Sequence, residues 1–267
     1  MRESSALRAS RARLAVVLRA TKDAISIQDT AHTLGLSRTA AAKLLSRWRK
    51  QGWLRRIGRG LYVRVPIDLA DSEQVVEDPW VLVPALFGQC YIGGWTAAHH
   101  WDLTDQLFNE TVVFTTRRVS AKRVAAQGVT FVLHHIGEQR LFGLKSLWRG
   151  TSRVNISDPA RTLIDMLAMP ETGGGIDHVA ECLATYANSA SFDSSLLIRH
   201  AEQLGNGAVY KRLGFLAQAL LHHEELAKAC GARMTQGHAQ LDPARPSRHL
   251  QTAWRLWVPE RWRKVAP

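Results

Sequence analysis

The sequence contains little cysteine and no long apolar segment, and these two features limit the classes of protein to which it can belong. Its three cysteines, Cys90, Cys182 and Cys230, stand far apart in a chain of 267 residues. An odd count at such spacing forms neither a metal pattern nor a disulfide framework, which favours a reducing cytoplasm. The longest nearly apolar run, 80–88, contains a proline and is much shorter than the roughly 20 residues that span a bilayer. The arginine-rich N-terminus lacks the apolar block of a secretory signal, so we expect a cytoplasmic protein without a membrane partner.

Acidic residues are scarce in the first quarter of the chain. Residues 1–65 carry fifteen Lys and Arg but three acids, Glu3, Asp23 and Asp29, which gives this segment a net charge of +12. Residues 66–267 carry twenty of each sign and are neutral. A small basic segment joined to a neutral body is typical of an attached nucleic-acid-binding module.

Three amphipathic segments within residues 1–65 predict three helices. In the second segment, Ser26 and Asp29 have the spacing of a capping box, and Gly35 suits a left-handed helix end. Ser37 is the expected N-cap of a third helix over about 38–51. Two short helices joined by a tight turn predict a helix-turn-helix.

The third predicted helix has two chemically different faces. Ala41, Leu45 and Trp48 share the side that is expected to pack on the first two helices. The opposite side carries cations and hydroxyl groups without an acid: Thr39, Lys43, Ser46, Arg47 and Lys50. Because the second helix of such a motif enters the major groove N-terminal end first, we expect base contacts from Arg38, Thr39 and Lys43. Arg47 and Lys50 are expected to reach phosphates.

Residues 53–65 predict a β-hairpin directly after this helix. Two short β-runs, the second an alternating run over 61–65, flank a turn at Gly58-Arg59-Gly60. A hairpin at this place is the wing of a winged helix-turn-helix, and a plain basic hairpin is the alternative. The candidate DNA-binding residues are therefore Ser37, Arg38, Thr39, Lys43, Arg47, Lys50, Arg55, Arg56 and Arg59.

After an acidic linker at 66–76, the pattern of residues 77–267 is mixed. β-rich runs at 110–116 and 129–136 precede a series of helical segments. Asp158-Pro159 starts the first of these helices and Met169-Pro170 ends it. The expected fold class is α+β: a winged helix-turn-helix over 1–65, the linker, and a mixed α/β domain over 77–267 with a helical C-terminal part. The tail is Pro-rich, and its tryptophans are expected to dock on the body: Trp254, Trp257 and Trp262.

The body offers only weak signals for catalysis or metal binding. Neighbouring residues of a His-His pair point in different directions, so such pairs predict no metal site. Asp158 and Asp165 could form a catalytic carboxylate pair, but a helix cap and an ion pair between Arg161 and Asp165 explain them better. We therefore expect no catalytic residue, no metal and no cofactor. A basic cluster could touch the DNA backbone, although a solvated loop explains it better: Arg117, Arg118, Lys122 and Arg123.

Four motifs resemble the AbiEi family of abortive-infection antitoxins, which are predicted transcriptional regulators of phage-defence systems. They are GRGLYVR, YIGGWTAAHHWDL, VNISDPARTLIDML and LDPARPSRHLQTAWRLWVPE. The chain has Trp101-Asp102-Leu103 where the family more often has Gly-Leu. The resemblance implies a winged helix that represses its own operon at inverted-repeat operator DNA. It also implies a C-terminal domain that counters a co-encoded nucleotidyltransferase-like toxin, in some pairs without direct contact.

The predicted function is therefore a DNA-binding repressor and antitoxin, not an enzyme. The alternative is a nuclease targeted to DNA by its winged helix. A metal-dependent nuclease needs acids on a strand edge to hold a hard cation. The β-runs VVFTT and VTFVLHH contain no acid, which favours the repressor.

Overall fold

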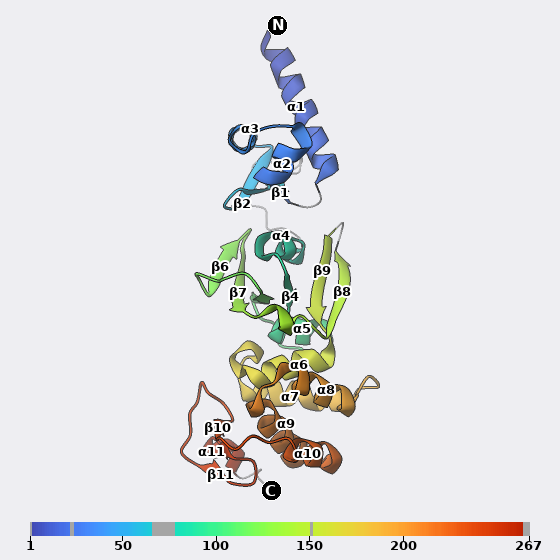
Figure 1. Cartoon of the computed structure of the whole chain (residues 1–267), viewed down its shortest axis with the longest axis vertical. Coiled ribbons are helices and arrows are strands. Elements are labelled where there is room, and N and C mark those ends of the chain that lie inside the picture. The colour runs from blue at the N-terminus through green and yellow to red at the C-terminus, as the bar shows by residue number, and fades with distance from the viewer. Residues whose placement is uncertain (1, 22–23, 66–77, 150–151, 264–267) are drawn as a thin grey trace. The chain divides into compact units, whose positions relative to one another are not determined.

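The computed structural model of the chain describes residues 2–21, 24–65, 78–149 and 152–263. The predicted linker at 66–76 lies outside these residues. The fold is α+β, as expected, with a helical N-terminal region, several sheets and a helical region near the C-terminus (Figure 1).

The N-terminal region contains three helices followed by a hairpin. Its elements are α1 (Arg2–Ala20), β1 (Ile25–Ser26), α2 (Ile27–Leu34), α3 (Arg38–Lys50), β2 (Leu54–Gly58) and β3 (Leu61–Arg64). The predicted caps are confirmed. Ser26 and Asp29 form a capping box at the start of α2, Gly35 ends α2 with φ +60°, and the Ser37 side chain caps α3.

Strand β1 was not predicted from the sequence. It pairs antiparallel with β3, which makes a three-stranded sheet in the order β1-β3-β2. The predicted alternation over 61–65 is wrong, because Tyr62 and Val63 are both buried. Tyr62 packs in the apolar cluster of the three helices, whereas Val63 packs in a second cluster with Ile57 and Leu82. Both faces of this short strand are therefore covered.

A six-stranded sheet follows, in the order β6-β7-β5-β4-β9-β8. Its strands are β4 (Cys90–Ile92), β5 (Glu110–Thr115), β6 (Arg123–Ala126), β7 (Val129–His135), β8 (Leu144–Arg149) and β9 (Ser152–Ser157). β4 and β9 run parallel, with Ile92 opposite Ile156. Short helices precede and follow the strands: η2 (Pro79–Leu82), α4 (Val83–Phe87), α5 (Gly94–His100) and η3 (Glu138–Arg140). Asp78 caps the first of these helices.

The helical region is built around one central helix. Its elements are α6 (Pro159–Ala168), η4 (Pro170–Gly173), α7 (Ile176–Ala187), α8 (Ser194–Leu204), α9 (Gly207–Ala219) and α10 (Glu224–Gly231). α6 packs against α5, α7, α8 and α9, which explains why even its charged residues are buried. The sequence of 208–223 predicts a single helix, and this prediction is wrong at its end, because α9 stops at Ala219. His222 takes a positive φ of 51°, and a separate helix, α10, follows.

The C-terminal segment forms a second three-stranded sheet, which the sequence did not predict. Its strands are β10 (Ala239–Gln240), β11 (Leu250–Gln251) and β12 (Leu256–Trp257), in the order β10-β12-β11, and α11 (Glu260–Arg263) follows. The expected docking is confirmed for Trp254 and Trp262, which are buried in the core of the helical region, while Trp257 is half-buried.

The structure divides into two compact units. The first contains residues 1–90, 123–131 and 146–154, and the second contains 91–122, 132–145 and 155–267. The division into domains at 1–65 and 77–267 stays a prediction.

Candidate nucleic-acid interface

Helix α3 is anchored through one face. Ala41, Leu45 and Trp48 are each 0% exposed, as the periodicity predicted. The Trp48 indole Nε1 also donates a hydrogen bond of 2.9 Å to the Ser10 Oγ, which ties α3 to α1. The anchored face fixes which side chains of α3 point outward.

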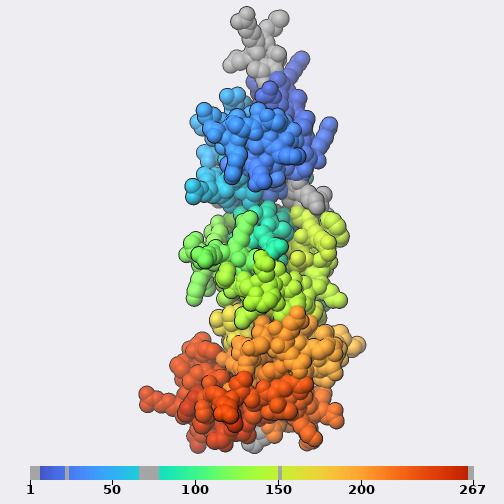
Figure 2. All heavy atoms as spheres, viewed as in Figure 1, coloured from blue at the N-terminus to red at the C-terminus, as the bar shows by residue number. Residues whose placement is uncertain are grey.

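The outward face of α3 is basic and exposed. Thr39, Lys43, Arg47 and Lys50 are exposed on this face, and Ser46 is half-buried among them. Arg38 and Arg49 are exposed on the flank of the helix, nearer the anchored face. None of these six exposed side chains makes a hydrogen bond or ion pair with any described residue. Ser37 differs, because its hydroxyl accepts a hydrogen bond of 3.2 Å from the Ala40 backbone N–H. The exposed cations are thus available to an external anion. Figure 2 shows one face of the N-terminal region, in blue.

The hairpin turn places Arg59 at an exposed tip. Gly60 takes φ +74°, and a Cβ there would lie 3.0 Å from the Ile27 Cδ1. The Ile27 N–H donates to the Gly60 carbonyl at 3.1 Å, which fixes the turn beside the start of α2. The Arg56 Nε donates to the Gly58 carbonyl at 2.9 Å, so this guanidinium lies along the turn.

Arg55 has a partner within the protein. It is half-buried, and its Nη1 donates to the Gln127 Oε1 in the β6–β7 turn at 3.4 Å. Of the nine predicted residues, eight are exposed and Arg55 is half-buried. The exposed ones are Ser37 at the N-cap of α3, Arg38, Thr39, Lys43, Arg47 and Lys50 on α3, and Arg56 and Arg59 on the hairpin. Sequence reasoning did not propose Arg11, Arg13 and Arg49, which are exposed on α1 and α3. Arg11 lies over the Trp53 ring at 5.5 Å, a tertiary contact that periodicity does not reveal.

The acids of α6 form a structural network. Asp158 caps the helix by accepting from the Arg161 backbone N–H at 2.8 Å, and the Arg161 Nε donates to the Asp165 Oδ1 at 3.0 Å. The Tyr91 hydroxyl donates to the Asp165 Oδ2 at 2.9 Å. Burial raises the pKa of the Tyr91 hydroxyl well above its usual value, so it stays a donor. The predicted cap and ion pair are confirmed.

The described residues contain neither a metal-binding cluster nor a membrane-spanning helix. No group of three or more His, Cys, Asp or Glu side chains in this part of the chain is placed to hold a metal ion. No helix among the described residues is long and apolar enough to cross a membrane.

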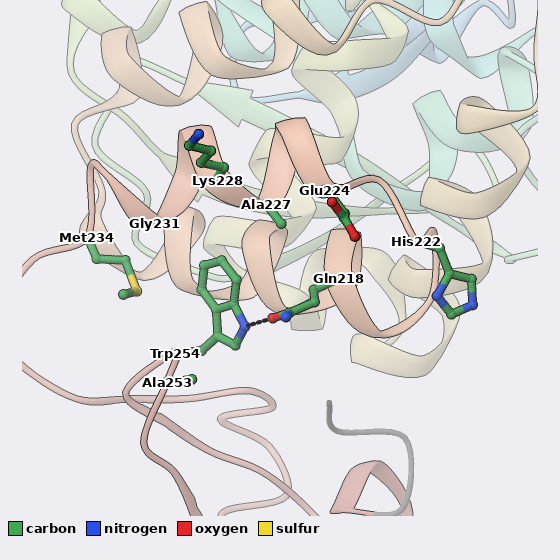
Figure 3. Close-up of a pocket in the computed structure, with 9 residues that line it drawn as sticks. All are labelled: Gln218, His222, Glu224, Ala227, Lys228, Gly231, Met234, Ala253 and Trp254. Carbon is green, nitrogen blue, oxygen red and sulfur yellow. Dashed lines mark hydrogen bonds between the residues drawn. The ribbon is translucent and has the colours of Figure 1, made fainter.

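A surface groove of about 570 Å³ lies between α9, α10 and the turn at 253–254 (Figure 3). In this groove the Trp254 indole points toward Gln218, and its Nε1 donates to the Gln218 Oε1 at 2.7 Å. Glu224 and Lys228 line the same groove from α10. This arrangement buries the Trp254 ring.

The basic N-terminal segment is similar in sequence to a family of regulators. Residues 13–65, which contain α2, α3 and the hairpin, match the family model of the AbiEi antitoxin transcriptional regulators. The match confirms an AbiEi-like N-terminal segment. No curated protein matches the chain in sequence.

A solved structure extends the likeness to the whole fold. The crystal structure of the RV2827C protein from Mycobacterium tuberculosis superposes with a TM-score of 0.58 at 16% sequence identity. The superposition covers 94% of this chain and 90% of the other. At this identity the likeness concerns the fold alone.

Proposed function

We propose that residues 1–65 form a winged helix-turn-helix and that the chain is a transcriptional repressor that binds operator DNA. In this proposal α3 lies in the major groove and the β2–β3 hairpin is the wing. The observation that carries it is the anchored helix α3, whose outward face holds unpaired cations and no acid. The match of residues 13–65 to a regulator family supports the same conclusion.

The family also supports an antitoxin role for the rest of the chain. We propose that this cytoplasmic protein represses its own operon at inverted repeats and that residues 77–267 counter a co-encoded nucleotidyltransferase-like toxin in phage defence. No step of this function requires the protein to be an enzyme. Arg55 belongs to the proposed wing as a residue of β2. Its guanidinium is not proposed to contact DNA, because it already contacts Gln127.

Charge reversal on α3 tests the proposal. The double variant Lys43→Glu/Lys50→Glu should lose binding to the promoter fragment of its own operon in a gel-shift titration. The matched control is Lys145→Glu/Lys228→Glu, which changes the net charge equally at exposed lysines outside the N-terminal region. The control should bind like the wild-type protein. Equal losses in both variants would mean that net charge alone governs binding, and unchanged binding by the α3 variant would refute the proposed interface.

A further inference from the structure

The composition of α3 restricts what this helix can read. Arg38–Lys50 contains no Asn, Gln, Asp or Glu, on any face. In the major groove, Asn and Gln recognise adenine through a pair of hydrogen bonds, and Asp or Glu accepts from the cytosine amino group. Neither of these contacts is available to α3. Lys and Arg donate to the guanine O6 and N7, and small methyl-bearing side chains contact the thymine methyl group.

The geometry of the helix selects the side chains that face the bases. At 100° per residue, Thr39, Lys43 and Ser46 follow one another along the side opposite Ala41, Leu45 and Trp48. Ala42 is half-buried beside this stripe. Arg38 lies on the flank of the helix and not on the stripe, but it is exposed in the first turn. The N-terminal half of a recognition helix lies closest to the base edges. Lys43 is thus the central cation of the reading stripe, with methyl groups from Thr39 and Ala42 next to it.

We infer that α3 reads guanine through Lys43 and Arg38 and the thymine methyl group through Thr39 and Ala42, so each operator half-site contains guanine beside thymine. This inference rests on the proposed DNA-binding function and adds to it the identity of the bases. The hydroxyl groups of Thr39 and Ser46 can pair with any base edge and do not change this restriction.

Base analogues test the inference with the full-length protein. A footprint on the promoter first defines the half-site. Synthetic duplexes then carry 7-deazaguanine, which lacks the N7 acceptor, or uracil, which lacks the thymine methyl, at single positions. Anisotropy titrations of the wild-type protein should show a loss of about 5- to 150-fold for at least one guanine, and a smaller loss at a neighbouring thymine.

Variants assign the effect to side chains. Each of the variants Lys43→Ala and Arg38→Ala should bind two duplexes with equal affinity: the unmodified duplex, and the duplex that carries 7-deazaguanine at the position the lost side chain contacts. The control Lys50→Ala, further along the helix, should weaken both duplexes alike and keep their ratio. If the wild-type protein binds the promoter but tolerates 7-deazaguanine everywhere, or is as sensitive to 7-deazaadenine, the inference is wrong while the proposed function stands. If it binds no promoter duplex, the proposed function itself fails.

Discussion

At the scale of single residues, burial changes the pKa of two thiols, those of Cys182 and Cys230. Both thiols lie in the core of the helical region and are 0% exposed. Burial raises the pKa of each thiol to about 12, because the apolar surroundings disfavour the thiolate. A buried neutral thiol behaves as a small apolar side chain, and its reactivity toward electrophiles is low.

We predict that the two thiols make the protein less stable at alkaline pH. In the unfolded chain they lose protons near pH 9.0, whereas in the folded protein they keep them up to about pH 12. Their contribution to stability is therefore present below pH 9 and declines as the pH rises, by about 1.4 kcal/mol per pH unit for each thiol. Urea unfolding at pH 8 to 10 measures this decline. Cys182→Ala removes one thiol and should show a shallower decline, and identical pH slopes in the two proteins would contradict the assignment.

At the scale of elements, specific side-chain contacts hold the C-terminal segment in place, although its sequence has little helical or strand periodicity. The Trp262 indole Nε1 donates to the Asp177 Oδ1 at 2.7 Å, which joins α11 to α7. The Arg212 guanidinium on α9 donates to the carbonyls of Gln240 and Leu167, both at 2.7 Å. Trp254 fits against Gly214 of α9. These contacts tie a segment with little regular structure to the helices.

We predict that Gly214→Ala destabilises the protein. A Cβ at Gly214 would lie 2.0 Å from the Trp254 Cζ3, and the indole is buried and donates a hydrogen bond to Gln218 that restricts its position. Alanine in a helix interior normally stabilises by about 1 kcal/mol relative to glycine, so a loss of about 1–3 kcal/mol would show that the clash dominates. Urea denaturation measures it. The control is Gly237→Ala, where a Cβ meets nothing within 4 Å. A stabilised Gly214→Ala protein would mean that the Trp254 contact is loose.

The elements that sequence could predict are those with local signals. α3 follows from the Ser37 cap and from the spacing of Ala41, Leu45 and Trp48, and α6 follows from Asp158-Pro159. Other elements have no local signal: β1 has two residues and forms because β3 lies beside it, and β10 to β12 depend on one another.

In the candidate site, too, some features could be predicted from the sequence and others could not. The exposure of the α3 cations follows from helix geometry. The contact between Arg55 and Gln127 joins residues 72 positions apart, and no pattern in the sequence reveals it.

At the scale of the whole molecule, the charge is concentrated where binding is proposed. Residues 1–65 carry a net charge of +12, while residues 66–267 are neutral. Binding to DNA releases counterions in proportion to the phosphates that cations neutralise. The neutral part of the chain adds no net attraction to a polyanion.

This charge distribution predicts a steep salt dependence. If about five to eight cations of the N-terminal region meet phosphates, log affinity should fall with log salt at a slope of roughly −5 to −7. Arg59→Ala should reduce the slope by about 1, on operator and scrambled DNA alike. Titrations at several salt concentrations measure it. A slope near zero, or an Arg59→Ala slope equal to the wild-type value, would exclude the hairpin tip from the phosphate contacts.

The last prediction concerns the division of labour between the two parts of the chain. The proposed antitoxin part, residues 77–267, carries a net charge of only +3 and has its own extensive apolar core around α6, so we expect it to act without DNA. Deleting residues 1–65 is a poor test, because the hairpin residues Ile57 and Val63 share an apolar cluster with Leu82. The full-length variant Lys43→Glu/Lys50→Glu avoids this problem, since both side chains are exposed.

In a strain that carries the neighbouring toxin gene under a separate inducible promoter, this variant should restore growth as well as the wild-type protein does. In the same strain it should fail to repress a reporter driven by the operon promoter. A variant with an unfolded core, Leu163→Asp at a fully buried position of α6, should fail in the growth assay. Because the toxin is transcribed from a foreign promoter, repression of the operon cannot account for rescue. Growth restored by the wild-type protein but not by the double-lysine variant would mean that protection requires the α3 surface, and the neutral part of the chain would then have a supporting role only.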